Sequence, residues 1–539
     1  MRNGFTKKRS KPGDKFITAA QAVLAIPPNS TLVTGGFIGS GFPESLAIAL
    51  EQRFLRSQLS LSENSLSGLT LVYAGGQGDN GERGLNHLAH PGLLSCIIGG
   101  HWGLVPKLQQ LVISNQVEAY NLPQGVISQL FRDIAGHRPG LLTKVGLGTF
   151  VDPRQSAGRL NKKSTRTLLE LLRIGDTDYL FYKSFQIDSC FLRGTTSDEF
   201  GNITMEREAL TLDSLAIAMA THNCGGTVIV QVERLAKGGS LKSREVQIPG
   251  ILVDHVVLPD FPEHHMQTFT EPYSAVFSGE LLAPPAKQVE LALNTRKIIV
   301  RRASLELCAH DIVNLGVGIP EGLANLADEE NIVDLMTLTA EPGVVGGIPA
   351  SGLNFGAATN AQAILDQPYQ FDFYGGGGLD IAILGMAQVD AQGNVNVSLF
   401  NGHLAGAGGF IDISQNTQRL VFVGTFCAGT QKINVISKNL VVNLEGETKK
   451  FIARVEQITF NGQQAALRAQ NVLYVTERCV FRLTKEGPEL IEIAPGIDLD
   501  KDILAKMDFV PKISPFLKKM DVRIFSEMPM KLREELLNK

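Results

Sequence analysis

The feature that most constrains the fold is an internal repeat. The segment Gly41-Phe-Pro-Glu-Ser-Leu-Ala47 recurs 277 positions later as Gly318-Ile-Pro-Glu-Gly-Leu-Ala324. A second set of matches lies 192 positions apart and pairs Asp188, Asp198, Gly201, Asn202 and Ile203 with Asp380, Asp390, Gly393, Asn394 and Val395. Because the matches keep their order, the chain is predicted to contain two related halves. The difference between 277 and 192 gives the first half 85 additional residues between Glu44 and Asp188.

Both halves alternate short β-branched runs with longer amphipathic segments. The runs predicted as strands are Thr31–Thr34, Leu69–Tyr73 and Val228–Val232 in the first half, and Ile312–Leu315, Val333–Thr339 and Leu420–Gly424 in the second. Such alternation is typical of βαβ units with a parallel sheet that is buried on both faces. We therefore expect an α/β fold, with two related open α/β domains in tandem on one chain and mainly parallel sheets.

The length of 539 residues gives each half enough chain for its own core. We expect residues 1–15 to be a basic tail and residues 16–257 to form the N-terminal half. Residues 258–286 are dotted with proline, lack clear periodicity and are predicted to be a linker. Residues 287–539 form the C-terminal half with a C-terminal extension, and this half opens on a predicted helix over 289–308, rich in Arg and Lys.

Composition excludes several classes of protein. Lys and Arg number 50 against 54 Asp and Glu, a net charge of −4, so no basic stripe is available for nucleic acid. No apolar run approaches the roughly 18 residues of a membrane span. The six cysteines are scattered without a C-x-x-C pair, which excludes a zinc ribbon or a disulfide framework and favours a reducing compartment. We expect a cytoplasmic protein with neither a nucleic-acid nor a membrane partner.

The two glycine loops that precede the repeated prolines resemble dinucleotide-binding fingerprints. Gly39-Ser-Gly41 and Gly316-Val-Gly318 both have glutamate where the third glycine should stand, and a carboxylate there competes with a pyrophosphate. A nicotinamide oxidoreductase is therefore a weak alternative, and no phosphate-binding P-loop is present. For the first copy we favour a tight strand-to-helix turn with an early proline.

The histidines and serines give no strong catalytic signal. His87, His90 and His101 lack metal-ligand spacing, as does Asp254-His255 with His264-His265, so we expect no metal. No G-x-S-x-G elbow is present, which disfavours a serine hydrolase.

One acidic residue follows a predicted strand directly. The run Val333–Thr339 leads into Ala340-Glu341-Pro-Gly343, so that Glu341 leaves the carboxyl end of a buried strand and enters a glycine turn. The alternative is a solvated glutamate at the start of a loop. Two further glycine clusters, 374–380 and 406–412, let backbone N–H groups approach a ligand closely. A carboxylate among such donors suits nucleophilic catalysis with a stabilised oxyanion.

Several motifs of the chain, taken together, resemble those of a known family. Glu341-x-Gly343-x-x-Gly346 is similar to the Glu-Asn-Gly-type signature of family I coenzyme A transferases. The stretches that resemble the single-chain acetate/propionate CoA-transferases are 371–380, 405–413 and 492–499 in the second half, and 77–79, 100–103 and 120–125 in the first. The resemblance covers residues from about 16 to 520. The chain departs from the family pattern at Pro342, where asparagine is usual, and proline has no backbone N–H to donate.

The resemblance implies roles for specific residues. Glu341 would form a γ-glutamyl-CoA thioester, Gly409 would be a backbone oxyanion donor, and Gln124 would be a side-chain partner near the glutamate. The residues expected to lie along CoA are Gly316, Val317, Gly318, Ile319, Pro320 and Gly408. Coenzyme A would be the substrate and covalent intermediate, with no tightly bound cofactor, and the enzyme would be a homo-oligomer, either a dimer or a tetramer.

The implied function is transfer of CoA from a short-chain acyl-CoA to a carboxylic acid in the acetate, propionate and butyrate range, with ping-pong kinetics. The 85 additional residues of the first half, which include Gln124, are expected to bring that half over the Glu341 crevice. An acyl-CoA hydrolase that uses the same thioester is the main alternative, because only exclusion of water separates the two. A non-catalytic CoA sensor is disfavoured by the intact Glu341 and its glycine loops.

Overall fold

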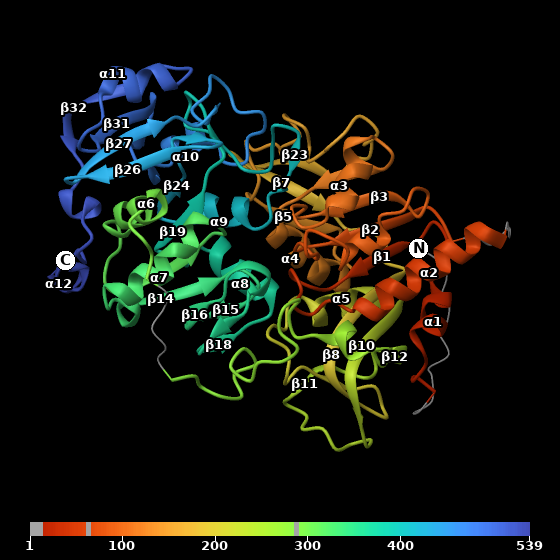
Figure 1. Cartoon of the computed structure of the whole chain (residues 1–539). Helices are drawn as coiled ribbons and strands as arrows, with labels where there is room; N and C mark the ends of the chain where they lie inside the picture. The colour runs from red at the N-terminus through yellow and green to blue at the C-terminus, as the bar shows by residue number, and fades with distance from the viewer. Residues whose placement is uncertain (1–13, 61–65, 285–289, 539) are drawn as a thin grey trace.

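The computed structural model describes residues 14–60, 66–284 and 290–538. The chain forms two α/β halves, each built around one large sheet, that lie side by side (Figure 1). Residues 1–13 of the predicted basic tail lie outside the described residues. Lys15 already belongs to the fold, because its carbonyl accepts from the Val256 N–H at 2.8 Å and its Nζ donates to the Gly250 carbonyl at 2.5 Å.

The sheet of the first half has seven parallel strands. Their order is β12 (His255–Val257), β10 (Thr227–Ala236), β8 (Ser189–Asp198), β1 (Thr31–Thr34), β2 (Leu69–Tyr73), β3 (Leu94–Gly99) and β4 (Glu118–Asn121). Two short strands, β9 (Ile203–Thr204) and β11 (Val246–Ile248), continue from β8 in antiparallel pairing. The parallel strands are buried on both faces, as near-continuous apolar runs predict.

The sheet of the second half is mixed. Its strand order is β18 (Ala363–Ile364), β15 (Val344–Val345), β14 (Met336–Ala340), β13 (Asp311–Leu315), β19 (Ile381–Gly385), β24 (Arg419–Val423), β29 (Asn471–Val475), β30 (Cys479–Thr484), β31 (Gly487–Ile493) and β32 (Lys512–Lys519). The five strands from β14 to β29 are parallel, whereas β15, β18 and β30 pair antiparallel to their neighbours. β31 is antiparallel to β30 and parallel to β32.

Two predicted elements begin or end elsewhere than expected. Residues Val333–Leu335 form a short 3₁₀ turn instead of a strand, because pairing with β13 starts only at Met336, opposite Asp311. The predicted helix over 289–308 is shorter, and α6 runs from Thr295 to Ser304. The Asn294 side chain caps it by accepting from the Lys297 N–H, which fixes its start.

The repeated aspartates have the same structural role in each half. Asp188 accepts from the first residue of β1, Thr31, at 2.9 Å, and Asp380 accepts from Ile312 in β13 at the same distance. The next repeated pair closes a turn in each half. Asp390 accepts from the N–H groups of Gln392 and Asn394 and from the Asn394 amide. Asp198 makes the equivalent bonds to Phe200 and Asn202. The repeat in the sequence therefore corresponds to a repeat in the structure.

The additional residues of the first half extend its sheet. They include β3 and β4, which continue the parallel sheet beyond β2, and α3 (Pro106–Ile113), which connects these two strands. A separate three-stranded sheet follows, with the order β5 (Gly140–Thr143), β7 (Thr177–Lys183) and β6 (Leu169–Ile174). In the second half, the chain turns back beside β14 as the antiparallel strand β15, so that sheet has no counterpart of β3 and β4.

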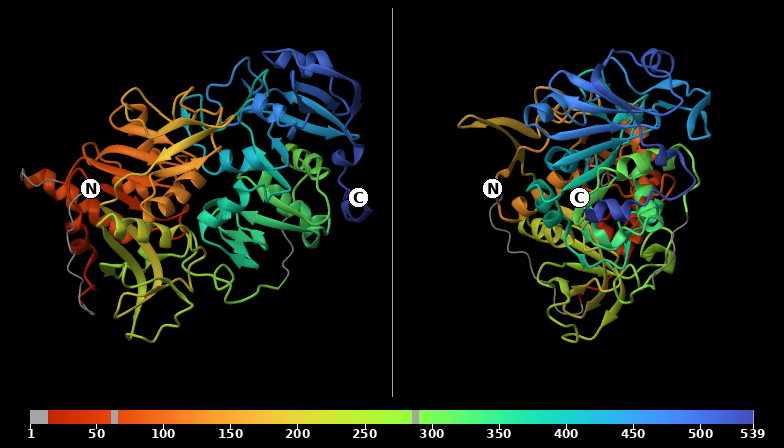
Figure 2. Two further views of the ribbon diagram at one scale, coloured as in Figure 1. Left: turned by 180° about the vertical axis from the view of Figure 1, so that it is seen from behind. Right: turned by 90° about the vertical axis from the view of Figure 1, so that its left-hand side faces the viewer.

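Helices from both halves meet at the centre of the molecule. Helix α4 (Gln124–Ala135) packs against α5 (Ser214–Asn223) of its own half and against α8 (Gln367–Gly375) and α9 (Phe410–Asn416) of the other. The views in Figure 1 and Figure 2 show these helices between the two sheets. Besides α3 and α6, whose bounds are given above, the remaining helices of eight residues or more in the described ranges are α2 (Glu44–Ser60) and α7 (Gly322–Glu329). The additional residues thus bring α4 into contact with the second half.

The segment predicted as a linker packs closely onto both halves. Phe269 belongs to an apolar cluster with Phe37 of the first half and with Ala340 and Phe355 of the second. Buried Arg193 donates to the Met266 carbonyl at 2.7 Å and pairs with Glu208, which holds the segment against the first sheet. The connection between the halves is therefore part of their shared core.

The turn around Asp390 gives a test of the repeat framework. Asp390 is fully buried and accepts four hydrogen bonds at 3.0–3.3 Å, the fourth from the Val455 N–H. The substitution Asp390→Ala leaves these donors unpaired, so we expect it to lower the free energy of unfolding by roughly 3 kcal/mol, measured in urea. Asp500→Ala, at an exposed position, is the control and should change it by less than about 0.5 kcal/mol. Equal effects of the two substitutions would contradict a structural role for the turn.

Candidate active site

Glu341 is the first residue after β14, at the carboxyl end of a strand in the parallel part of the sheet. The turn that follows requires glycine. Gly343 has a φ of +126°, and a Cβ there would lie 2.0 Å from the Leu365 carbonyl oxygen. Gly346 has a φ of +75°, and a Cβ would lie 2.6 Å from the Gln362 side chain. The E-x-G-x-x-G spacing therefore describes a tight turn that fixes where the glutamate leaves the strand.

The Glu341 carboxyl is partly buried and has no charged partner. No hydrogen bond or ion pair joins it to another described residue, which leaves both oxygens free to react. Burial raises the pKa of this carboxyl to about 7. A carboxylate with a raised pKa is a stronger nucleophile than an exposed one, and it is still ionised in a large fraction of molecules near neutral pH.

Gly409 lies directly against this carboxyl. A Cβ built on Gly409 would lie 3.2 Å from both Cδ and Oε2 of Glu341. Gly409 precedes the first turn of α9, and its N–H donates to no acceptor in the part of the chain that the structure describes. The structure thus brings together the predicted nucleophile and the predicted backbone donor.

Gln124 reaches the same turn from the first half. It is the first residue of α4 and is fully buried. Its Nε2 donates to Gln367 Oε1 at 3.1 Å, whereas its Oε1 has no hydrogen-bond partner among the described residues. That oxygen would lie 3.7 Å from a Cβ on Gly408, the residue before Gly409. The Gln124 carboxamide and the Glu341 carboxyl therefore face successive residues of one turn.

The glycine turn at 406–409 is held by the first half. The Gly408 N–H donates to the Gly100 carbonyl at 2.8 Å, and the Gln124 N–H donates to the Gly408 carbonyl at 3.0 Å. Asn121 adds a third contact, because its Oδ1 accepts from the Ala407 N–H at 2.9 Å. The stretches at 100–103 and 120–125, which the family resemblance singled out, are the stretches that hold this turn in place.

His101 lies beside the turn but is electrically neutral. Burial and the nearby His403 lower the pKa of His101 to about 4. Its Cδ2 would lie 3.5 Å from a Cβ on Gly408. At neutral pH this imidazole contributes shape and no charge to the wall of the site.

The predicted CoA loop lies at the carboxyl end of the strand next to β14. Residues 316–320 follow β13, and Gly318 has a φ of +89° with no atom within 4 Å of a built Cβ. Val317 is 61% exposed, so the loop is open to an approaching ligand. Arg296 donates to the Gly318 carbonyl at 2.5 Å and places a cation beside this loop. No hydrogen bond or ion pair joins residues 316–320 to Glu341.

The corresponding loop of the first half is closed. A Cβ on Gly39 would lie 2.4 Å from the Phe269 backbone nitrogen, and Glu44 bonds inward to the Gly84 N–H and His87. This loop is the tight turn that the sequence analysis favoured. The two copies of the repeat have thus diverged, and only the second loop is accessible.

Three buried polar residues of the site gave no separate signal in the sequence. Asp412, in the first turn of α9, accepts from the Gly125 N–H at 3.2 Å. Burial, with a smaller contribution from the charge of Glu341, raises the pKa of Asp412 to about 8. Gln367 contacts Gln124, and its Nε2 donates to Asp213 Oδ2 at 3.3 Å. Asp412 falls inside a quoted motif, whereas Gln367 and Asp213 fall in none.

The glycines at 375–378 do not line the site. They end α8 and lead into β19, while Tyr374 points into the core and bonds to Thr339 and Gln370. This cluster was expected to offer backbone donors to a ligand, but the N–H groups of residues 376–378 already donate to carbonyl groups of α8. These glycines therefore terminate α8, and the Tyr374 hydrogen bonds fix the position of the helix.

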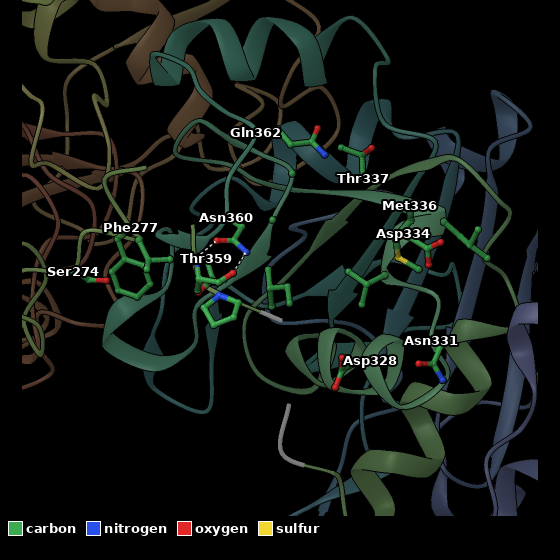
Figure 3. A pocket seen from close by; sticks show the side chains of 18 of the residues that line it. Ser274, Phe277, Asp328, Asn331, Asp334, Met336, Thr337, Thr359, Asn360 and Gln362 are labelled. Atoms are coloured by element: carbon green, nitrogen blue, oxygen red, sulfur yellow. Dashed lines mark hydrogen bonds between the residues drawn. The ribbon is translucent and has the colours of Figure 1, made fainter. Parts of the chain in front are cut away.

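A large cavity lies away from this site. It measures about 1070 Å³ and opens at the opposite end of β14, between the 271–284 segment and the residues that lead into the strand, where Phe277 and Asn331 face one another across it (Figure 3). Neither Glu341 nor Gly409 lines it. Cavity size alone does not mark the site of the reactive carboxyl.

The histidines outside the site form ion pairs and hydrogen bonds. His87 and His90 both contact Glu51, at 2.6 Å. Across the described residues, no three His, Cys, Asp or Glu side chains gather in a way that could hold a metal ion. Within the same residues, no helix has the length and apolar character needed to cross a membrane.

Comparison with known proteins gives a family, and relatives that match most of this chain. A family model described as coenzyme A transferase matches residues 16–258. The chain is 46% identical to a caffeate CoA-transferase of Acetobacterium woodii, over 95% of this chain and 98% of that protein. It is 43% identical to the acetate CoA-transferase YdiF of Escherichia coli K12, over 95% of this chain and 96% of that protein.

Solved structures give the same result. The crystal structure of the YdiF acyl-CoA transferase of Escherichia coli O157:H7, as a thioester complex with CoA, matches with a TM-score of 0.88 and 42% identity over 96% of this chain and 97% of that one. The apoenzyme of the same protein matches with a TM-score of 0.90 and 41% identity. The sequence, the fold and the arrangement around Glu341 therefore lead to one conclusion: this chain belongs to the coenzyme A transferase family.

Proposed function

We propose that this enzyme transfers CoA from a short-chain acyl-CoA to a carboxylic acid through a γ-glutamyl-CoA thioester on Glu341. The observation that carries the proposal is the Glu341 carboxyl, which has no partner among the described residues and lies against the Gly409 backbone. A relative at 42% identity, whose structure is described as a thioester complex with CoA, supports the same chemistry.

The first half-reaction has two displacements. A Glu341 oxygen attacks the thioester carbonyl, forming a C–O bond and breaking the C–S bond, so that a mixed anhydride and CoA thiolate result. The thiolate then attacks the γ-carbonyl of Glu341, forming the enzyme thioester and releasing the acyl group as a carboxylate. An incoming carboxylate reverses both displacements and leaves as a new acyl-CoA. One thioester replaces another, so the overall exchange is close to thermoneutral.

Both displacements develop negative charge on a carbonyl oxygen. We assign the stabilisation of that charge to the Gly409 N–H and the Gln124 carboxamide, which face the turn beside Glu341. The loop at 316–320, together with Gly408, is assigned to CoA, because it is open and its strand adjoins β14. Contacts to the long CoA molecule supply binding energy remote from the reacting bond, which can be used to lower the barrier.

The acid substrate is proposed as acetate, propionate or butyrate. One relative is named for acetate and another for caffeate, at 43% and 46% identity, so relatedness alone does not separate small from aromatic acids. The crowding around Glu341 favours the smaller acids, since Phe371 would lie within 3.2 Å of a Cβ on Gly409. A homo-oligomeric state and a cytoplasmic location stay predictions.

The assignment of Glu341 as the nucleophile can be tested by substitution. Glu341→Gln should lower the rate of CoA transfer by roughly 10³-fold or more, because the amide keeps the shape but cannot form the thioester. Intact-protein mass spectrometry after incubation with acetyl-CoA should show a CoA adduct that hydroxylamine removes, in the wild type only. Glu486→Gln, at an exposed position, is the matched control and should react normally. An adduct that persists in Glu341→Gln would refute the assignment.

The second prediction concerns the oxyanion donor. Gly409→Val places side-chain atoms within about 3 Å of the Glu341 carboxyl and displaces the backbone donor. We expect kcat to fall by roughly 10²–10³-fold. Gly375→Val is the control, because nothing lies within 4 Å of a Cβ at Gly375. The melting temperature of each variant shows whether folding is affected. A loss of stability that accounts for the lost activity would mean that Gly409 is required only for packing.

The third prediction separates transfer from hydrolysis, the alternative function. A bound carboxylate is held next to the thioester at high effective concentration, whereas water must enter a buried site. Labelled acetate or propionate should therefore enter the acyl-CoA pool much faster than free thiol appears from acyl-CoA alone, with ping-pong kinetics. Butyrate and caffeate tested alongside define the range of acids. If thiol release without an acceptor is as fast as exchange, the enzyme is a hydrolase.

A further inference from the structure

A chain of three buried side chains leads from the reaction site into the first half. Gln124 Nε2 donates to Gln367 Oε1 at 3.1 Å, and Gln367 Nε2 donates to Asp213 Oδ2 at 3.3 Å. The exposed fractions of Gln124, Gln367 and Asp213 are 0%, 1% and 3%. At the end nearest the reaction site, Gln124 Oε1 faces Gly408 and has no donor among the described residues.

Two arrangements of hydrogen bonds fit these side-chain positions, because a carboxamide presents an acceptor on one side and a donor on the other. With Asp213 ionised, each amide donates toward Asp213, and the Gln124 oxygen faces the site. With Asp213 protonated, its O–H donates to Gln367 Oε1. Both carboxamide groups are then flipped, so that the oxygen and nitrogen of each exchange places. Gln367 Nε2 then donates to Gln124 Oε1, and the Gln124 N–H groups face the site.

The surroundings of Asp213 favour the protonated form. No ion pair joins it to a cation in residues 14–60, 66–284 or 290–538, and the charged group that faces it, Asp366 immediately before α8, is another carboxylate. The backbone N–H of Asp213 and the Ser128 hydroxyl of α4 favour the ionised form, and burial outweighs both. Burial first, and then the charge of Asp366, raise the pKa of Asp213 to about 7. Asp366 itself accepts from Gln247 Nε2 at 2.7 Å.

We propose that Asp213 and Gln367 are positioning residues that set the orientation of the Gln124 carboxamide, and that protonated Asp213 turns the Gln124 N–H groups toward the turn beside Glu341. In this orientation, Gln124 stabilises the oxyanion of each displacement. Ionisation of Asp213 turns the Gln124 oxygen toward the site, where it repels the developing charge. This inference rests on the proposed function, in which Glu341 must be ionised and Gln124 must donate.

The pH dependence of kcat/KM for acyl-CoA tests the proposal. Ionisation of Glu341 gives an acid limb, and loss of the Asp213 proton gives an alkaline limb, so the wild type should show a bell-shaped profile centred near pH 7. Asp213→Asn keeps a donor for Gln367 at every pH, so its alkaline limb should disappear or move to higher pH. Asp412, whose pKa is about 8, faces the same site and accounts for any limb that remains at higher pH.

A second variant has the opposite expected effect. Asp366→Asn removes the charge that raises the pKa of Asp213, so its alkaline limb should move to lower pH. In a Gln367→Leu background, which breaks the chain, Asp213→Asn should have no further effect on the profile. An alkaline limb that stays at the wild-type position in both Asp213→Asn and Asp366→Asn would overturn the proposal.

Infrared spectroscopy tests the protonation state without turnover. At about pH 6, one unit below the pKa of Asp213 near 7, the wild-type minus Asp213→Asn difference spectrum should contain the C=O band of a protonated carboxyl. Absence of that band would overturn the proposed role of Asp213, even if the enzyme transfers CoA normally. A wild type that forms no CoA adduct would instead refute the proposed function, so the two failures are distinguishable. Melting temperatures show that the variants are folded.

Discussion

The site depends on hydrogen bonds between the glycine turn at 406–409 and the first half of the chain. Gly408 exchanges backbone hydrogen bonds with Gly100 and Gln124, and Asp412 accepts from the Gly125 N–H. These contacts join the start of α4 to the start of α9, which come from opposite halves. The 85 additional residues of the first half carry both Gly100 and Gln124, so this insertion completes the site that the second half contains. Neither half alone holds the reactive carboxyl, the backbone donor and the carboxamide together.

The repeat supplies the framework, and its divergence supplies the chemistry. The N–H groups of Thr31 and Ile312 donate equivalent hydrogen bonds to Asp188 and Asp380. The partners of these two residues on the next strand are Thr70 and Thr337. Four residues further along these strands lie Ala74 in the first half and Glu341 in the second. The reactive carboxylate therefore occupies a position where its counterpart has no functional group. The accessible loop after β13 and the closed loop after β1 show the same division between a structural half and a reactive one.

Three carboxyl groups, Glu341, Asp213 and Asp412, are gathered where the halves meet, and burial raises the pKa of each to between about 7 and 8. A group with a raised carboxyl pKa ionises in the unfolded chain at lower pH than in the folded one, so the fold loses stability as pH rises from the ordinary carboxyl range to about 8. The same low-dielectric surroundings strengthen the interaction of backbone donors with developing charge. Stability and catalysis thus depend in opposite senses on the burial of these acids.

The sequence by itself determined the two related halves, the parallel strands and the position of Glu341 after β14, because these follow from local periodicity, from ordered repeats and from a turn that requires Gly343. The family resemblance added Gly409 and Gln124, which the structure places beside the glutamate or its turn. Only the tertiary structure decided that Gln367 and Asp213 continue from Gln124, that Asp412 docks onto α4, and that the first loop is closed by Phe269. Those contacts join residues far apart in the sequence, and no local pattern encodes which distant segments pack together.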